Sequence, residues 1–198
     1  MEKLRLFVAI ETPSAVRERL AEVIATLRTT NADVRWEQTD KLHITLKFLG
    51  DAEQQSLGSI IASLERIAQS FPEFSIRYAS LGCFPHKREP RILWAGVESA
   101  DSMLGHLAKS IDDALATLGF KKEERAFHAH VTLGRVKSGR HMNHLLRTME
   151  SITFESQPVH VSHFVLVKSE LKQGGSVYTT LHEVSLQSHR NSQSNNPQ

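Results

Sequence analysis

The sequence predicts a mixed α and β domain of two similar lobes around a central cleft. Segments with strand periodicity alternate with amphipathic helical segments along most of the chain. A motif of histidine, apolar residue, threonine and apolar residue occurs at His43 and again at His130, 87 residues later (130 − 43). The same offset lays the strand-like segment 7–11 onto 94–98. These matches indicate an internal duplication in which each lobe contributes one histidine strand to the cleft.

In the first half of the chain, the residue pattern predicts strands followed by helices. Residues 4–11 are rich in strand formers and end at Thr12-Pro13. From residue 15 to 27 apolar residues recur at helical spacing, with Ser14 as the expected helix cap. We also expect strands at 34–36 and 43–48, a turn at Gly50-Asp51 and a helix at 54–68.

The second half repeats this order. Its expected elements are a strand at 92–98, a helix at 102–118, a strand at 130–135, a short helix at 143–149, and strands at 159–168 and 177–184. We therefore expect one two-lobed domain over residues 1–185. Because the chain from Ser188 onward has no apolar residue to bury, residues 186–198 are expected to form a disordered polar tail.

Composition narrows the class of protein. No apolar run approaches the roughly 20 residues of a membrane helix, and no signal peptide is evident. The single cysteine, Cys83, excludes an internal disulfide and fits a reducing compartment. The formal charge of +2 and the sequence pI of about 8.8 would tolerate a polyanionic partner. We expect a soluble, cytoplasmic monomer that does not bind membranes.

The paired motif places four polar side chains on one surface. Side chains alternate along a strand, so His43 and Thr45 share one face while Ile44 points into the core, and His130 and Thr132 repeat this arrangement. An imidazole and a hydroxyl then lie about 6 to 7 Å apart along each strand, a separation that a bridging phosphate group can span.

Two histidines suit in-line displacement at phosphorus. One imidazole can accept the proton of an attacking water while the other, as imidazolium, donates to the leaving oxygen, and an unperturbed pKa near 6.5 permits both roles. The threonine hydroxyls can donate to phosphoryl oxygens that gain charge in the transition state. This chemistry needs no metal and no other cofactor. The residues alone leave open which histidine is the acid.

Four segments and one further residue carry a resemblance to a known family. They are RLFVAI at 5–10, LHITLKFLG at 42–50, RILWAGV at 91–97, FHAHVTLGR at 127–135 and Tyr178. From about Leu4 to Val184 the chain resembles the RNA 2',3'-cyclic phosphodiesterases, once called 2'-5' RNA ligases and also LigT-like proteins. These belong to the two-histidine phosphoesterase superfamily. The resemblance implies an α+β fold in which antiparallel sheets, flanked by helices, surround a central cleft.

The resemblance also implies an activity and a role for each motif residue. His43 would be the general acid that protonates the leaving 3' oxygen, and His130 the general base that activates water. Thr45 and Thr132 would bind the phosphate, and Arg135 would either bind it or form a structural salt bridge. The expected partner is RNA with a 2',3'-cyclic phosphate end, such as a tRNA fragment. The product would be a 2'-phosphomonoester, and the reverse reaction would join RNA ends through a 2'-5' linkage.

Two residues depart from the pattern of the family. Ala129 stands where proline commonly precedes the second histidine, and Gly134 where alanine usually precedes the arginine. Neither change removes a functional group. Both leave the backbone near His130 less constrained.

Two other functions compete with this prediction. His128 and His130 have a spacing that metal ligands also use, which would suit a metal-dependent hydrolase. A non-catalytic RNA-binding module is the second alternative, because aromatic and basic residues that can stack on bases and bind phosphates lie close together at Phe84, Arg88, Arg91 and Trp94. Trp94, however, is expected to pack in the core.

Overall fold

The computed structural model describes residues 3–173 and 175–188. Within these residues a nine-stranded sheet forms, and each pair of neighbouring strands runs antiparallel. The strand order is β7-β4-β5-β6-β3-β1-β8-β9, with β2 paired to β6 off this path. The predicted α+β class with antiparallel pairing is confirmed.

The elements have the following bounds. They are β1 (Lys3–Glu11), α1 (Ser14–Arg28), β2 (Val34–Trp36), η1 (Thr39–Lys41), β3 (His43–Glu53), η2 (Gln54–Ser56), α2 (Leu57–Ala68), β4 (Phe74–Phe84), β5 (Ile92–Glu98), α3 (Met103–Ala116), β6 (His130–Val136), α4 (Met142–Ser151), β7 (Val159–Val161), β8 (His163–Lys172) and β9 (Gly175–Ser185).

Several local predictions were wrong. Ser14 is the first residue of α1, and no side chain caps that helix. The turn expected at Gly50-Asp51 lies inside β3, where pairing with β1 continues to Glu53. The strand expected at 159–168 is two strands, because β7 pairs with β4 whereas β8 pairs with β1 and β9.

Strand β4 was not predicted. Its buried residues Phe74, Ile76 and Tyr78 alternate with less buried neighbours, which is the period of a half-buried strand. The alternation ends near Ser80, where the backbone has a positive φ of 63° and the register with β5 shifts. The stretch with regular alternation of buried and exposed residues is therefore too short to indicate the whole of β4 from the sequence.

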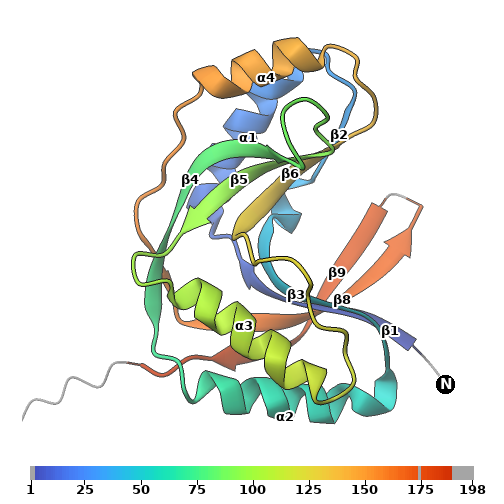
Figure 1. Ribbon diagram of the computed structural model, residues 1–198, viewed down its shortest axis with the longest axis vertical. Coiled ribbons are helices and arrows are strands. Elements are labelled where there is room, and N and C mark those ends of the chain that lie inside the picture. Colours follow the sequence, from blue (N-terminus) through green and yellow to red (C-terminus); the bar gives the residue numbers. More distant parts are fainter. Residues whose placement is uncertain (1–2, 174, 189–198) are drawn as a thin grey trace, which may run out of the picture.

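The sheet divides into two lobes that diverge on the side free of helices (Figure 1). The His43 lobe contains β1, β3, β8 and β9, covered by α2 and α3, and the His130 lobe contains β2 and β4–β7, covered by α1 and α4. The lobes exchange helices. Helix α1 follows β1 in the chain, yet its Arg19 donates to the carbonyl oxygen of Glu155 at 2.5 Å and lies over the ring of Phe154, beside β4.

Among the described residues, strand pairing joins the two lobes at one pair. Ile44 in β3 and Val131 in β6 are antiparallel partners, and both are fully buried. Thr45 lies opposite Ala9, and the corresponding Thr132 lies opposite Trp94. The structure therefore makes Ala9 equivalent to Trp94, whereas the 87-residue offset of the sequence aligned Phe7 with Trp94. This shift of two residues keeps each side chain on its expected face.

The domain extends slightly beyond its predicted end at residue 185. Leu186 is buried and its N–H donates to the carbonyl oxygen of Ser162, while the N–H of Gln187 donates to that of Phe71. An apolar side chain at 186 explains this extension, because it adds to the core. The rest of the predicted tail, residues 189–198, lies outside the described residues. None of the helices in the described part is long and apolar enough to cross a membrane.

Candidate active site

The predicted alternation along both motif strands is confirmed. The apolar motif residues are buried, with exposed fractions of 0 to 4%, and the polar ones are partly exposed. The buried residues are Ile44, Leu46, Val131 and Leu133, and the partly exposed ones are His43, Thr45, His130 and Thr132. Both histidines and both threonines thus face away from the core.

The antiparallel pairing of Ile44 with Val131 brings the two motifs together. Because the strands run in opposite directions, His43 lies on the same side of this pair as Thr132, and Thr45 on the same side as His130. Each histidine therefore has the threonine of the other motif across from it. This arrangement can surround a single phosphate with two imidazoles and two hydroxyls.

Backbone carbonyls orient both imidazoles in the same way. Nδ1 of His43 lies 2.7 Å from the carbonyl oxygen of Lys41, and Nδ1 of His130 lies 2.7 Å from that of His128. A carbonyl oxygen only accepts, so Nδ1 carries the proton in both rings. In the neutral ring Nε2 is then free to accept a proton, and in the charged ring it can donate one.

Burial and nearby charges act on the two histidines differently. Burial is the main cause that lowers the pKa of His43, and the carboxylates of Glu37 and Glu11 oppose it. Burial also lowers the pKa of His130, where the positive charge of Arg135 acts in the same direction. His43 thus has acidic neighbours, and His130 a basic one.

Aromatic rings surround each histidine. The ring centroids of Phe7 and Tyr178 lie 4.8 and 5.4 Å from that of His43. Burial, the largest cause, raises the pKa of the Tyr178 hydroxyl. In the other lobe the ring of Phe84 meets His130 edge-on at 5.1 Å. Both imidazoles therefore have one face or edge shielded from water.

Trp94 lies on the cleft face, so its predicted place in the core was wrong. Leu93 and Ala95 on the same strand are fully buried, and alternation turns Trp94 to the opposite side, where it is partly exposed and pairs with Thr132. Its indole lies over Gly82, where a Cβ atom would approach the ring to 2.2 Å.

Arg135 lies near the site and pairs with Glu37. The guanidinium Nε is 3.5 Å from the Glu37 carboxylate, and both side chains are partly exposed. The preceding residue, Gly134, packs closely on β2, because a Cβ atom there would lie 2.7 Å from Val34 Cγ1. The glycine that departs from the family pattern therefore allows close contact between β2 and β6.

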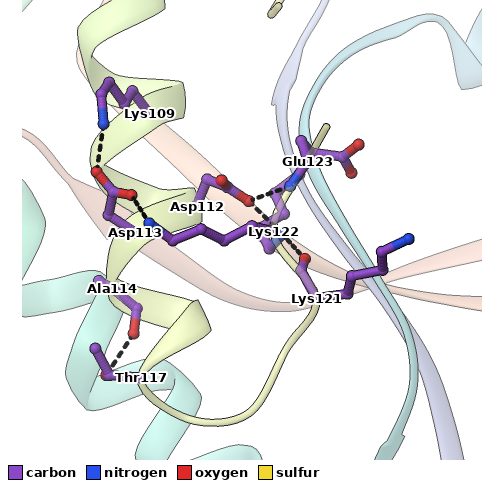
Figure 2. A network of polar contacts seen from close by, with 9 residues as sticks. Lys109, Asp112, Asp113, Ala114, Thr117, Lys121, Lys122 and Glu123 are labelled. Carbon is purple, nitrogen blue, oxygen red and sulfur yellow. Dashed lines mark hydrogen bonds and ion pairs between the residues drawn. The ribbon is translucent and has the colours of Figure 1, made fainter. Parts of the chain in front are cut away.

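A buried ion pair anchors the segment that leads to His130. The ammonium group of Lys47, which is fully buried, donates to the Asp112 carboxylate at 2.5 Å and to the carbonyl oxygen of Lys121 at 2.7 Å. The backbone N–H of Glu123 donates to the same Asp112 oxygen at 3.2 Å, as Figure 2 shows. Strand β3, helix α3 and the chain before β6 are thus tied together.

Of the residues behind the two alternatives, Phe84 and Trp94 lie together, with ring centroids 5.2 Å apart. Across residues 3–173 and 175–188, no three His, Cys, Asp or Glu side chains gather so that they could hold a metal ion. His128 packs against Phe84 and Trp94 at 5.1 and 5.0 Å. Arg91 pairs with Glu89 at 2.7 Å on the surface. These contacts do not favour either alternative over the two-histidine site.

Three residues beside the motifs were not predicted as site residues. They are Phe7, Glu37 and Tyr178. Alternation along the first strand could have indicated Phe7, because Phe7 and Ala9 share a face that the buried Val8 does not. No pattern in the sequence marks Glu37, whose position depends on the pairing of β2 with β6.

Comparison with known proteins places the chain in a family. The model described as LigT like Phosphoesterase matches it twice, over residues 10–94 and 97–178, which together make up most of its 198 residues. The chain belongs to the LigT-like phosphoesterase family. The two matches begin 87 residues apart (97 − 10), which is the separation of His43 and His130.

Relatives in this family match nearly the whole chain. The RNA 2',3'-cyclic phosphodiesterase of Thermotoga maritima is 32% identical over 180 residues, covering 91% of this chain and 94% of its own. That of Methanothermobacter thermautotrophicus is 31% identical and covers 90% and 97%. The crystal structure of TT0787 from Thermus thermophilus has a TM-score of 0.78 at 28% identity and covers 94% and 100%. E. coli LigT complexed with 3'-AMP has a TM-score of 0.74 at 26% identity and covers 93% and 99%.

Proposed function

We propose that this LigT-like enzyme hydrolyses the 2',3'-cyclic phosphate at the end of an RNA and leaves a 2'-phosphomonoester. One observation carries the proposal: two imidazoles on adjacent strands, each fixed by a backbone carbonyl at Nδ1, lie across from each other's threonine. The relatives named RNA 2',3'-cyclic phosphodiesterase, which match over most of their length, support the same activity.

The proposed reaction is an in-line displacement at phosphorus. His130 Nε2 accepts a proton from water as the water oxygen bonds to phosphorus, and the bond from phosphorus to the 3' oxygen breaks. His43 Nε2 donates its proton to that leaving oxygen. The 2' oxygen keeps the phosphate, and the hydroxyls of Thr45 and Thr132 bind the phosphoryl oxygens.

The charged neighbours support this assignment of acid and base. Glu37 and Glu11 favour the protonated form of His43, which an acid requires. Arg135 and His128 disfavour the protonated form of His130, which suits a base. In this proposal Arg135, balanced by Glu37, also adds positive charge near the phosphate.

We also propose which RNAs the enzyme acts on and where in the cell it works. Suitable partners are RNAs with a cyclic phosphate end, including tRNA fragments, because the motif contacts a phosphate and no base. If the 5' hydroxyl of a second RNA takes the place of water, the same groups catalyse 2'-5' joining. We propose a monomer that acts in the cytoplasm, where its one cysteine, Cys83, stays reduced.

A short oligoribonucleotide ending in a 2',3'-cyclic phosphate tests the function. In excess EDTA, the wild type and His106→Ala, a control on the exposed face of α3, should form a 2'-phosphate end, which nuclease mapping identifies. His43→Ala and His130→Ala should each lose at least about 10²-fold in kcat. Activity lost to EDTA would favour the metal-dependent hydrolase. RNA binding without hydrolysis by the wild type would favour the non-catalytic module.

A further inference from the structure

Three aromatic side chains form a surface on the cleft face of the His130 lobe, beside the histidine that acts as the base in the proposed reaction. They are Phe84, Trp94 and His128, and their ring centroids lie 5.0 to 5.2 Å from one another. Phe84 also meets the ring of His130 edge-on at 5.1 Å. All three side chains are at least partly exposed, so a ligand in the cleft can contact them.

Two arginines lie farther along the same face. Arg35 of β2 and Arg135 of β6 are antiparallel partners, so their side chains leave the sheet on one side. That side is the cleft, because Arg135 pairs with Glu37 and its charge acts on His130. Like charges directly opposite each other destabilise a sheet. Glu37 offsets the charge of Arg135, and an anion such as a phosphate would offset that of Arg35.

In-line geometry brings an incoming nucleophile to this lobe. Under the proposed function, on which this step rests, the attacking group gives its proton to His130. When the 5' hydroxyl of a second RNA attacks, the 5' oxygen bonds to phosphorus as its proton passes to His130, the bond from phosphorus to the 3' oxygen breaks, and His43 protonates that oxygen. The ribose and base of the attacking nucleoside therefore lie on the His130 side, next to Phe84.

We propose that Phe84, Trp94 and His128, which we call the acceptor surface, bind the first nucleoside of an RNA that carries a free 5' hydroxyl. The base stacks on the aromatic rings, a contact that depends little on sequence. Arg35 binds the phosphate that follows this nucleoside. Because water gains nothing from these contacts, the acceptor surface favours 2'-5' joining over hydrolysis when such an RNA is present.

Competition between two nucleophiles in one reaction isolates binding of the acceptor. The donor is a short oligoribonucleotide ending in a 2',3'-cyclic phosphate. The acceptor is either adenosine or 1-O-methyl-ribofuranose, which has a 5' hydroxyl but no base. The ratio of 2'-5' joined product to 2'-phosphate product, at acceptor concentrations below saturation, cancels donor binding and the chemistry that both reactions share. For the wild type this ratio should be about tenfold higher with adenosine.

Phe84→Ala removes the ring nearest to the nucleophile. The ratio with adenosine should fall about tenfold, to the value for the acceptor without a base, and the ratio for that acceptor should not change. A disturbed His130 or a less stable protein would slow joining and hydrolysis alike. The ratio therefore responds to acceptor binding and not to general damage.

Arg35→Gln tests the phosphate contact. With the dinucleotide adenylyl-3',5'-adenosine as acceptor the ratio should fall about threefold, and with adenosine it should stay the same. Arg28→Gln, at an exposed position in α1, should change neither ratio. An unchanged dinucleotide ratio in Arg35→Gln would overturn the phosphate contact.

Three results would overturn the acceptor surface itself. They are equal ratios of the wild type for adenosine and the acceptor without a base, an unchanged adenosine ratio in Phe84→Ala, and hydrolysis of the donor without any joined product. Failure of the wild type to hydrolyse the donor would instead contradict the proposed function.

Discussion

Leu46 and Leu133 occupy equivalent places in the two motif strands, 87 residues apart, and each is the extra residue of a β-bulge. In β3, Thr45 and Lys47 pair with the consecutive residues Ala9 and Val8, which leaves Leu46 without a partner. In β6, Thr132 and Gly134 pair with consecutive residues of β5, which leaves Leu133 unpaired in the same way. A bulge changes the face on which the next side chains of the strand lie.

The bulge in β3 explains the buried position of Lys47. Regular alternation would place Lys47 in the cleft beside Thr45. After the bulge it points to the helix-covered side, where it pairs with Asp112 of α3 and is fully buried. Removal of one partner of a buried ion pair strongly destabilises the folded protein, because the remaining buried charge is left without compensation.

We therefore predict that Lys47→Met lowers the free energy of unfolding by about 3 kcal/mol. Urea denaturation at neutral pH measures this change. Exchange of the amide hydrogens of residues 119–129 should also become faster, because the carbonyl of Lys121 and the N–H of Glu123 both belong to this network.

Lys122 offers a matched control for Lys47. It pairs with Asp113 at 2.6 Å, but its side chain is 61% exposed. Lys122→Met should leave the urea midpoint close to that of the wild type, because solvent weakens an exposed pair. Equal losses in Lys47→Met and Lys122→Met would show that burial of the Lys47 pair does not matter for stability.

The motif threonines should act in the transition state. Thr45→Val and Thr132→Val remove a hydroxyl and keep the shape of the side chain, so each should lower kcat about 10²-fold with an unchanged melting temperature. Steady-state kinetics on a cyclic phosphate substrate measures the effect. Thr179→Val, at an exposed position in β9, should have the kcat of the wild type. A rise in KM with an unchanged kcat would mean that the hydroxyls bind the substrate and its transition state equally.

The sequence predicted the two motif strands and their faces because apolar and polar residues alternate strictly up to each threonine. It could not predict the side-chain directions beyond the threonines, because the bulges at Leu46 and Leu133 depend on pairing with β1 and β5. Alternation alone would have buried Arg135, and the bulge in β6 instead places it on the exposed side, where its charge reaches His130.

No local pattern in the sequence indicates that the lobes exchange helices. The amphipathic pattern of α1 fixes which of its faces is buried but not which sheet covers that face. We propose that the two halves arose by duplication, as the two family matches with an 87-residue offset and the equivalent bulges suggest. Ala9 and Trp94 then mark where the halves diverged.

Gly82 should be required for the position of Trp94. A Cβ atom at residue 82 would lie 2.2 Å from the indole, so Gly82→Ala must displace a ring that also packs on Phe84 and His128. We expect a loss of about 1 to 3 kcal/mol in the free energy of unfolding, measured by urea denaturation. Gly58→Ala in α2, where a Cβ atom meets nothing within 4 Å, should not destabilise the protein. A Gly82→Ala protein as stable as the wild type would mean that Trp94 moves freely.

The pH profile should respond in opposite directions to the two charges beside the histidines. Burial lowers the pKa of both His43 and His130 below 6.5, so the bell-shaped profile of kcat/KM should have its optimum on the acid side of pH 6.5. The optimum of a two-group profile lies midway between the two pKa values, whichever group is the acid.

Removal of each charge then has a defined sign. Glu37 raises the pKa of His43, so Glu37→Gln should lower that pKa and move the optimum to lower pH. Arg135 lowers the pKa of His130, so Arg135→Gln should raise that pKa and move the optimum to higher pH. Glu22→Gln, on the exposed side of α1, should leave the optimum in place. If the pH optimum moved in the same direction in both variants, the charges of Glu37 and Arg135 would not determine the pKa values of the two histidines. Their ion pair would then act only through the structure of the site.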